Sequence, residues 1–326
     1  MSRSDTVRTG MLPVVGEVVV LRNGRWEIGV LPASGAALAY GRVLVGDRWR
    51  DLLRPTRTEH RTAPERCASF PLVPWSNRIA DGRLRFEGRE WMLARNGADG
   101  TAIHGATTGF AWTVVARDED RVVLELSTRD LVGVNFPWRF RARVAYTLTG
   151  DGLSVTTTVE NDDDETFPAG FGHHPYFQRS LAAGGPEAML EVPARRGYAL
   201  VRAMATGPAG DVPERADYRR LRPVGDVFVD DCLTDLEPGA PARIVYPAGP
   251  GLGEVEVRLT ADPVYSHTVV YAPRGRSYFA VEPVTNCNGA FALLDTPGTE
   301  HGVFLLGPGE QRTGTFTLEV RETSVT

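Results

Sequence analysis

The chain has 326 residues, of which 42% are hydrophobic, and it carries a formal net charge of −5. This length admits one large β domain or two ordinary domains, and the mixed charges offer no basic face of the kind that nucleic acid requires. All 36 basic residues other than histidine are arginine, which excludes both a Schiff-base lysine and a P-loop lysine.

The first predicted element is a β-hairpin over residues 17–31. Its Asn23–Gly24 dipeptide lies between two apolar runs, and such a dipeptide favours a tight turn in which both residues have positive φ. Two later segments, residues 55–70 and 213–223, could each hold a helical turn or two. Neither shows the sustained 3.6-residue apolar stripe of a longer helix.

Strands with alternating polarity dominate the rest of the chain. Residues 82–93 alternate on both sides of a Glu87–Gly88 turn, residues 143–161 alternate on both sides of a turn at 150–152, and residues 253–259 and 314–320 repeat the pattern. A period of two is typical of half-buried antiparallel strands. We therefore predict an all-β fold, a large antiparallel β-sandwich with few short helices. It should form a single domain over residues 1–326, with residues 195–222 as excursion loops.

The cysteines and the apolar segments bear on compartment and partners. The three cysteines, Cys67, Cys232 and Cys287, are far apart and form no CxxC pair, so neither a disulfide framework nor a zinc cage is expected. Residues 1–10 lack the apolar stretch of a signal peptide, and no apolar run is long enough to span a membrane. We expect a cytoplasmic monomer or homodimer with no metal, no cofactor, and no membrane or nucleic-acid partner.

Two adjacent histidines, His173 and His174, are the most distinctive polar feature. On a strand their side chains leave opposite faces, so they cannot both serve one substrate. One should face a site and the other the core or solvent. Pro175 lacks an N–H group and should interrupt the ladder, and Tyr176–Phe177 would add aromatic surface against which a sugar can lie.

Five segments, in order, resemble the aldose 1-epimerase (galactose mutarotase) family. They are "PWSNRIADGRLRFEG", "NGADGTAIHGATTGFAW", "GFGHHPYF", "FVDDCLTDL" and "VEPVTNCNGAF". The resemblance implies the galactose mutarotase-like supersandwich and an enzyme that interconverts the α and β anomers of an aldose. Its only partner would be a small sugar.

The resemblance also implies a set of site residues. Glu282 would be the base on the C1 hydroxyl, His174 the acid toward the ring oxygen, and His104 an assistant at that oxygen. Arg78, Asn77 and Asp230 would bind sugar hydroxyls, with Asp231 as the alternative to Asp230. His173 replaces an Asn that is common in the family, and a Gln expected near residues 267–273 is missing. Both departures concern contacts specific to galactose.

The implied chemistry makes one expectation about charge. A free histidine titrates near a pKa of about 6.5, so a neighbouring carboxylate should keep His174 protonated near neutrality. Three alternatives stay open, and one of them is a glycosidase, since carboxylate pairs can hydrolyse glycosides. The chain could be a mutarotase of a phosphorylated or sulfonated sugar, held by arginine, or a non-catalytic carbohydrate-binding protein of the same fold.

Overall fold

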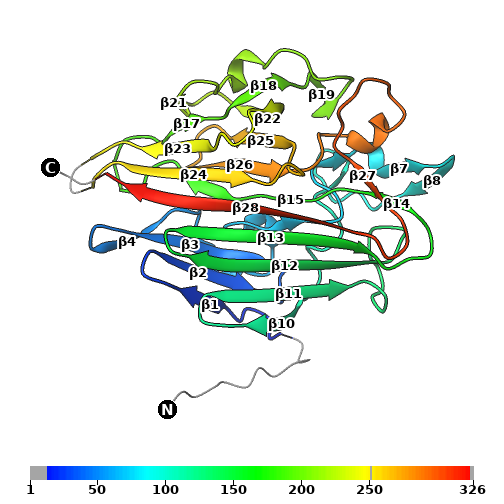
Figure 1. Cartoon of the computed structure of the whole chain (residues 1–326), viewed down its shortest axis with the longest axis horizontal. Helices are drawn as coiled ribbons and strands as arrows, with labels where there is room; N and C mark the ends of the chain where they lie inside the picture. Colours follow the sequence, from blue (N-terminus) through cyan, green and yellow to red (C-terminus); the bar gives the residue numbers. More distant parts are fainter. Residues whose placement is uncertain (1–12, 250–251, 324–326) are drawn as a thin grey trace.

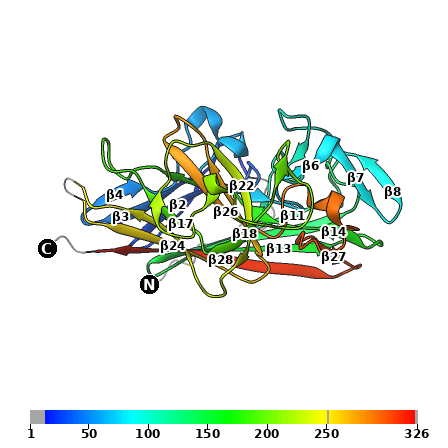
Figure 2. The same cartoon turned by 90° about the horizontal axis from the view of Figure 1, so that it is seen from above.

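The structure is a computed structural model that describes residues 13–249 and 252–323. These residues form 28 strands and five short 3₁₀ helices, and no α-helix occurs among them. Figure 1 shows the long strands stacked side by side along the molecule, and Figure 2 shows the layers from above. The predicted all-β antiparallel architecture is therefore confirmed.

The largest sheet has nine antiparallel strands in the order β10-β11-β12-β13-β28-β24-β23-β17-β21. Its centre is the long hairpin of β12 and β13, paired in turn with β28 near the C-terminus. The bounds are β10 Thr113–Arg117, β11 Arg121–Ser127, β12 Phe140–Thr149, β13 Gly152–Asn161, β17 Met189–Glu191, β21 Arg222–Pro223, β23 Ala242–Tyr246, β24 Val255–Ala261 and β28 Gln311–Glu322.

A second sheet of seven strands has the order β18-β22-β25-β26-β15-β5, and β16 also pairs with β26. The bounds are β5 Pro71–Leu72, β15 Gly172–His173, β16 Tyr176–Gln178, β18 Ala194–Gly197, β22 Val229–Leu236, β25 His267–Ala272 and β26 Tyr278–Val284. Single bridges, Leu38 to Ser69 and Leu53 to Phe177, join this sheet to a four-stranded sheet. That sheet consists of β1 Val19–Arg22, β2 Trp26–Leu31, β3 Ala37–Val45 and β4 Arg48–Asp51.

Four two-stranded ladders and five 3₁₀ helices make up the rest of the regular structure in the described residues. The two-stranded ladders are β14 Phe167–Ala169 with β27 Phe304–Leu306, β19 Leu200–Val201 with β20 Met204–Ala205, β6 Arg78–Ile79 with β9 Ala102–Ile103, and β7 Arg83–Phe86 with β8 Arg89–Met92. The 3₁₀ helices are η1 Thr58–His60, η2 Pro64–Arg66, η3 Ala80–Gly82, η4 Glu214–Ala216 and η5 Ala290–Leu293. No helix of the described residues is long and apolar enough to cross a membrane.

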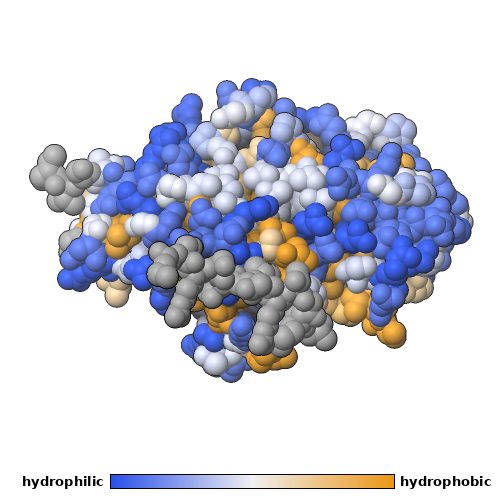
Figure 3. Space-filling model, turned by 60° about the horizontal axis from the view of Figure 1, so that its bottom comes forward, coloured by the Kyte–Doolittle hydropathy of each residue, from blue (hydrophilic) through white to orange (hydrophobic). Residues whose placement is uncertain are grey.

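The main core lies between the nine-stranded sheet and the other two large sheets. One cluster of buried apolar residues extends from Val19 on β1 to Val320 on β28. The Tyr146 hydroxyl on β12 donates to the Ala36 carbonyl beside β3, and the Tyr246 hydroxyl on β23 donates to the Gln178 carbonyl on β16. The face shown in Figure 3 is mostly hydrophilic, with hydrophobic residues only in small groups.

The predicted hairpins form, although one turn differs from its prediction. Glu87 and Gly88 have φ of 47° and 73°, as a two-residue hairpin turn requires. Neither Asn23 nor Gly24 has positive φ, so the predicted turn type is wrong there. Instead the Asn23 side-chain oxygen accepts hydrogen bonds from the Arg25 and Trp26 N–H groups, at 2.9 and 2.7 Å.

Two further expectations can be compared with the structure. All three cysteines, for which no disulfide framework was expected, are free and buried in the structure. The prediction that residues 195–222 are excursion loops is wrong in part. β18 pairs with β22 at the edge of the seven-stranded sheet, and β19 and β20 form a small hairpin. Short strands of two to four residues leave too little alternation to be recognised.

Candidate acid–base site

The register of the seven-stranded sheet places His174 beside Glu282. Gly172 lies opposite Val284 and Tyr176 lies opposite Ala280, so position 174 falls opposite position 282. The His174 Nε2 atom is 3.2 Å from the Glu282 Oε1 atom, and the two side chains are 7% and 3% exposed. Pro175 separates β15 from β16, as its missing N–H group predicts.

The neighbouring histidine points to the opposite face. His173 is fully buried in the main core, where its ring centroid lies 6.0 Å from that of Tyr146 and 5.3 Å from that of Phe316. Burial lowers the pKa of His173 to about 3, so this imidazole is neutral at physiological pH. The prediction that one histidine of the pair faces the core is confirmed. Phe177 also lies in this core. Of the two aromatic residues that follow Pro175, Tyr176 alone therefore lies beside His174.

Aromatic rings surround His174 and control its solvation. The ring centroid of Tyr176 lies 4.2 Å from that of His174, and Phe70 stacks on His174 with centroids 5.2 Å apart. His104 meets His174 edge to face at 5.4 Å. The His174 Nδ1 atom is buried without a hydrogen-bond partner in the protein. A buried, unpaired ring nitrogen is uncommon, and such groups call for an explanation.

His104 and Asn77 face each other in a strained backbone conformation. Their φ values are 63° and 56°, and the His104 N–H group donates to the Asn77 carbonyl at 2.9 Å. Non-glycine residues in this region cost about 1–3 kcal/mol each and persist only where neighbouring structure holds them. Burial, followed by the positive charge of Arg78, lowers the pKa of His104 to about 3. This imidazole is therefore also neutral near pH 7.

Arg78 connects the remaining predicted residues. Its guanidinium donates to the Asp99 carboxylate at 2.8 Å, to the Asn77 side-chain oxygen at 3.1 Å and to the Asp230 carboxylate at 3.3 Å. The planar, permanently charged fork of arginine suits several directed hydrogen bonds at once. Asp99 is itself fixed by Thr101, whose hydroxyl donates to it at 2.7 Å.

The side chains of the two adjacent aspartates of β22 point to opposite faces of the sheet, as those of the two histidines do. Asp230 lies opposite Tyr271, on the face that carries Glu282. Asp231 is fully buried on the other face, where both of its oxygens accept from Arg215, at 2.6 and 2.7 Å. Burial raises the pKa of Asp230, and the charge of Arg78 partly offsets this. Of the two alternatives, the structure places Asp230 beside Arg78.

The protonation state of the central pair differs from our expectation. Burial, and next the charge of Asp230, raise the pKa of Glu282 well above its usual range. Burial, and next the neighbouring His104, lower the pKa of His174 well below its usual range. The expectation that a carboxylate keeps His174 protonated near neutrality is not borne out for the free protein, because burial is the largest cause acting on both groups and opposes the charged form of each. A neutral pair that shares one proton across the 3.2 Å contact is favoured.

All six predicted site residues therefore lie in one region. His104, His174 and Glu282 meet at its centre, and Asn77, Arg78 and Asp230 lie to one side. Sequence reasoning missed Asp99 and Phe70, which contact Arg78 and His174 respectively. Asp99 lies within one of the five quoted segments, five residues before His104, and that proximity was the available signal.

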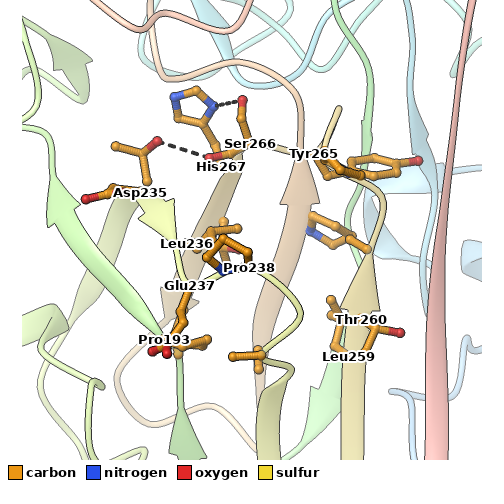
Figure 4. A pocket seen from close by; sticks show the side chains of 18 of the residues that line it. Pro193, Asp235, Leu236, Glu237, Pro238, Leu259, Thr260, Tyr265, Ser266 and His267 are labelled. Carbon is orange, nitrogen blue, oxygen red and sulfur yellow. Dashed lines mark hydrogen bonds between the residues drawn. The ribbon is translucent and has the colours of Figure 1, made fainter.

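One cavity of about 460 Å³ lies elsewhere, between the ends of β22, β24 and β25. Figure 4 shows Leu236, Pro238 and Leu259 along its wall, with Asp235 and Glu237 nearby. None of the six predicted residues lines this cavity, so it is not the candidate site. Within the described residues, no group of three or more His, Cys, Asp or Glu side chains is arranged to hold a metal ion.

Comparison with known proteins gives a family match and several similar proteins. The family described as aldose 1-epimerase matches residues 17–319. Two uncharacterized proteins of Escherichia coli (strain K12) are similar. YphB is 29% identical over 285 residues, 83% of this chain and 90% of YphB, and YihR is 32% identical over 268 residues, 78% of this chain and 85% of YihR.

Solved structures show the same fold. A galactose mutarotase-like protein from Clostridium acetobutylicum superposes with a TM-score of 0.82 at 18% identity, over 96% of this chain and 98% of that one. The GalM/aldose epimerase homologue from C. elegans gives 0.76 at 18% identity, over 94% and 99%. The predicted galactose mutarotase-like fold is confirmed.

Proposed function

We propose that this chain, which belongs to the aldose 1-epimerase family, is a mutarotase that interconverts the α and β anomers of a free aldose. One observation carries the proposal. A buried carboxyl and a buried imidazole, Glu282 and His174, come from different segments and meet at 3.2 Å on one face of a rigid sheet. Such a pair can exchange two protons with a bound molecule in concert.

Mutarotation requires that the sugar ring open and reclose. A proton leaves the C1 hydroxyl, a proton reaches the ring oxygen, and the C1–O5 bond breaks. In our proposal Glu282 accepts the first proton and His174 donates the second. After rotation about C1–C2 the two residues exchange roles, and the ring closes on the other face of C1. Each positioned proton transfer typically accelerates a reaction by about 10² to 10⁴.

The shared proton of the free pair fits this cycle. The reactive form, a carboxylate with an imidazolium, has the same number of protons as the neutral pair. Arg78 lowers the pKa of Glu282 and so favours the carboxylate. Sugar binding would only have to move one proton within the pair, without exchange with solvent. His104, neutral and next to His174, could hold the ring oxygen by a hydrogen bond.

The charges around the pair favour a neutral sugar over a phosphorylated or sulfonated one. The guanidinium of Arg78 is already paired with the Asp99 and Asp230 carboxyl groups. The other arginine whose charge reaches His174 is Arg54, and its Nη2 atom already donates to the Glu65 and Cys67 carbonyls. An anion would thus meet the Asp99 and Asp230 carboxyl groups around an Arg78 that is already paired. Hydroxyl groups, by contrast, can accept from Arg78 and donate to Asp230.

Polarimetry on freshly dissolved α-glucose and α-galactose tests the proposal, with NMR exchange spectroscopy as a second measurement. We expect the protein to accelerate anomer exchange, and Glu282→Gln to remove about 10² to 10⁴ of that acceleration. The matched control is Glu319→Gln. It changes a carboxylate on β28, outside the candidate site, and should behave like the wild type. Saturable sugar binding without faster exchange would identify a binding protein instead. Acceleration confined to hexose 6-phosphates would favour the charged-sugar alternative.

A further inference from the structure

A buried asparagine after β26 forms a two-way connection to the segment that carries Arg78. The Asn286 side chain is 1% exposed, and its Oδ1 atom accepts from the Ser76 N–H group at 3.3 Å and from the Ser76 hydroxyl at 3.0 Å. Its Nδ2 atom donates to the Ser76 carbonyl at 3.1 Å and to the Cys287 carbonyl at 3.1 Å. The amide thus pairs with Ser76 much as a neighbouring strand would.

The connection joins two parts of the candidate site that are 210 residues apart in sequence. Asn286 follows Glu282 by four residues, and Ser76 directly precedes Asn77 and Arg78. The same loop binds the segment a second time, because the Gly289 N–H group donates to the Arg78 carbonyl at 3.1 Å. Residues 76–78 are therefore held at both ends by residues 286–289.

The segment needs such support, because its own structure is short and strained. Asn77 has a φ of 56°, and it is followed by the two-residue strand β6 and the three-residue helix η3. A non-glycine residue in this conformation relaxes unless other contacts fix it. An apolar side chain at position 286 would leave the Ser76 N–H and carbonyl groups unpaired in a buried environment.

Few residue types could replace Asn286. Aspartate would lose both Nδ2 donors and would bury a charge, and glutamine is one methylene longer. Asn286 also packs closely against Gly170, because a Cβ atom at position 170 would come within 2.2 Å of the Asn286 Oδ1 atom. Only a side chain with one acceptor and two donors at this length satisfies the surrounding groups.

We propose that Asn286 is a positioning residue that sets Arg78 relative to Glu282, acting through Ser76. It does not touch the sugar. The kinetic consequences of this inference rest on the proposed mutarotase function, whereas the structural consequences do not. The prediction is specific: loss of Asn286 weakens sugar binding, because Arg78 supplies hydroxyl contacts, but leaves the Glu282–His174 pair in its register.

Steady-state kinetics of Asn286→Ala test the kinetic part. A charged hydrogen bond is worth about 1.5–3 kcal/mol, so a misplaced Arg78 should raise KM at least about tenfold. We expect kcat to change less than about threefold, with an unchanged pH profile, because the reacting pair is untouched. The matched control is Asn161→Ala. Asn161 is equally buried and donates to the Glu165 and Leu306 carbonyls, neither of which belongs to the candidate site.

Hydrogen exchange tests the structural part independently of activity. In Asn286→Ala, amide exchange in peptides that cover residues 74–79 should rise by about tenfold or more, and in Asn161→Ala it should not. If the wild type accelerates no sugar, this measurement still supports or overturns the positioning role. A KM increase equal to that of Asn161→Ala, or unchanged exchange at residues 74–79, overturns the inference.

A milder variant covers the case in which Asn286→Ala does not fold. Ser76→Ala removes only the hydroxyl hydrogen bonds to Asn286 and keeps both backbone bonds. One neutral hydrogen bond is worth about 1 kcal/mol, so KM should rise by about three- to fivefold. A KM equal to that of the wild type would contradict the proposal.

Discussion

The two faces of the seven-stranded sheet place the same residue types in different surroundings. His173 and His174 are adjacent, yet one lies among Tyr146 and Phe316 and the other against Glu282. Asp230 and Asp231 are separated in the same way, one toward Arg78 and one toward Arg215. The side-chain period of a strand therefore assigns the role, and residue type alone does not.

The faces also differ in how their charges are held. On the face that carries His173 and Asp231, here called the inner face, both carboxylate oxygens of Asp231 are bonded to the guanidinium of Arg215. On the outer face, which carries Glu282, Arg78 is shared among Asn77, Asp99 and Asp230. A shared guanidinium can exchange one partner for a ligand, whereas both carboxylate oxygens of Asp231 are already bonded to Arg215.

The largest expected effect separates the two histidines. His174→Ala should lower kcat/KM by about 10² to 10⁴, because an acid in the reacting pair is lost. His173→Asn should leave kcat/KM within about threefold of the wild type, since its ring does not reach the site. NMR exchange at an aldose concentration well below KM measures both. Comparable losses in the two variants would break the distinction between the faces.

The two arginines provide the next contrast. Arg215→Ala leaves Asp231 buried and unpaired, and we expect the free energy of unfolding to fall by about 2 kcal/mol, less than for a fully buried pair because Arg215 is half exposed. Urea denaturation measures this, and KM should not move. Arg78→Ala should instead raise KM by about tenfold or more. A KM change in Arg215→Ala would show that the inner face contributes to binding.

Buried histidines on both faces predict loss of stability in acid. Burial lowers the pKa of His173 to about 3 and that of His267 to about 4. Below a pH of about 6.5 the unfolded chain binds these protons and the folded chain does not, so the free energy of unfolding falls as the pH drops. Each histidine should cost about 2 kcal/mol by pH 5. Urea titrations at pH 7 and pH 5 measure the combined effect of all groups with shifted pKa values, His104 among them, and His173→Asn should reduce the difference by about 2 kcal/mol.

The smallest expected effect concerns the exposed partner of Arg78. Asp99 is 42% exposed, and ion pairs with exposed partners contribute little, about 0–1 kcal/mol. Asp99→Asn should therefore raise KM by only about two- to fivefold, through looser orientation of Arg78. The control Glu90→Gln alters another exposed pair, with Arg85, and should have no effect. A larger loss in Asp99→Asn than in Arg78→Ala would indicate that Asp99 contacts the sugar itself.

Local patterns predicted the fold well where they were long. The alternation in residues 143–161 became the β12–β13 hairpin, and Glu87–Gly88 formed the predicted turn. Asn23–Gly24 illustrates the limit, because the Asn23 side chain offers an alternative way to close a turn that the dipeptide alone does not reveal. Strands of two residues, such as β19 and β20, have no readable period.

The candidate site was predictable through family resemblance, and only in part. The resemblance indicated His174 and Glu282, and strand geometry indicated that His173 would face away. The Asn286–Ser76 connection spans 210 residues, and no local pattern announces it. The protonation of His174 was predicted wrongly because desolvation depends on packing around Phe70 and Tyr176, which composition does not contain.

The ladder between β26 and the segments on either side of Pro175 has a consequence for how this family can vary in length. The same register holds on both sides of Pro175: Gly172 lies opposite Val284, and Tyr176 lies opposite Ala280. Inserting or deleting one residue inside Tyr278–Val284 would turn Glu282 into the apolar interior and bring a hydrocarbon side chain against His174. Insertions and deletions should therefore occur mainly in the connecting loops, where substrate preference can change while the Glu282–His174 pair stays in place.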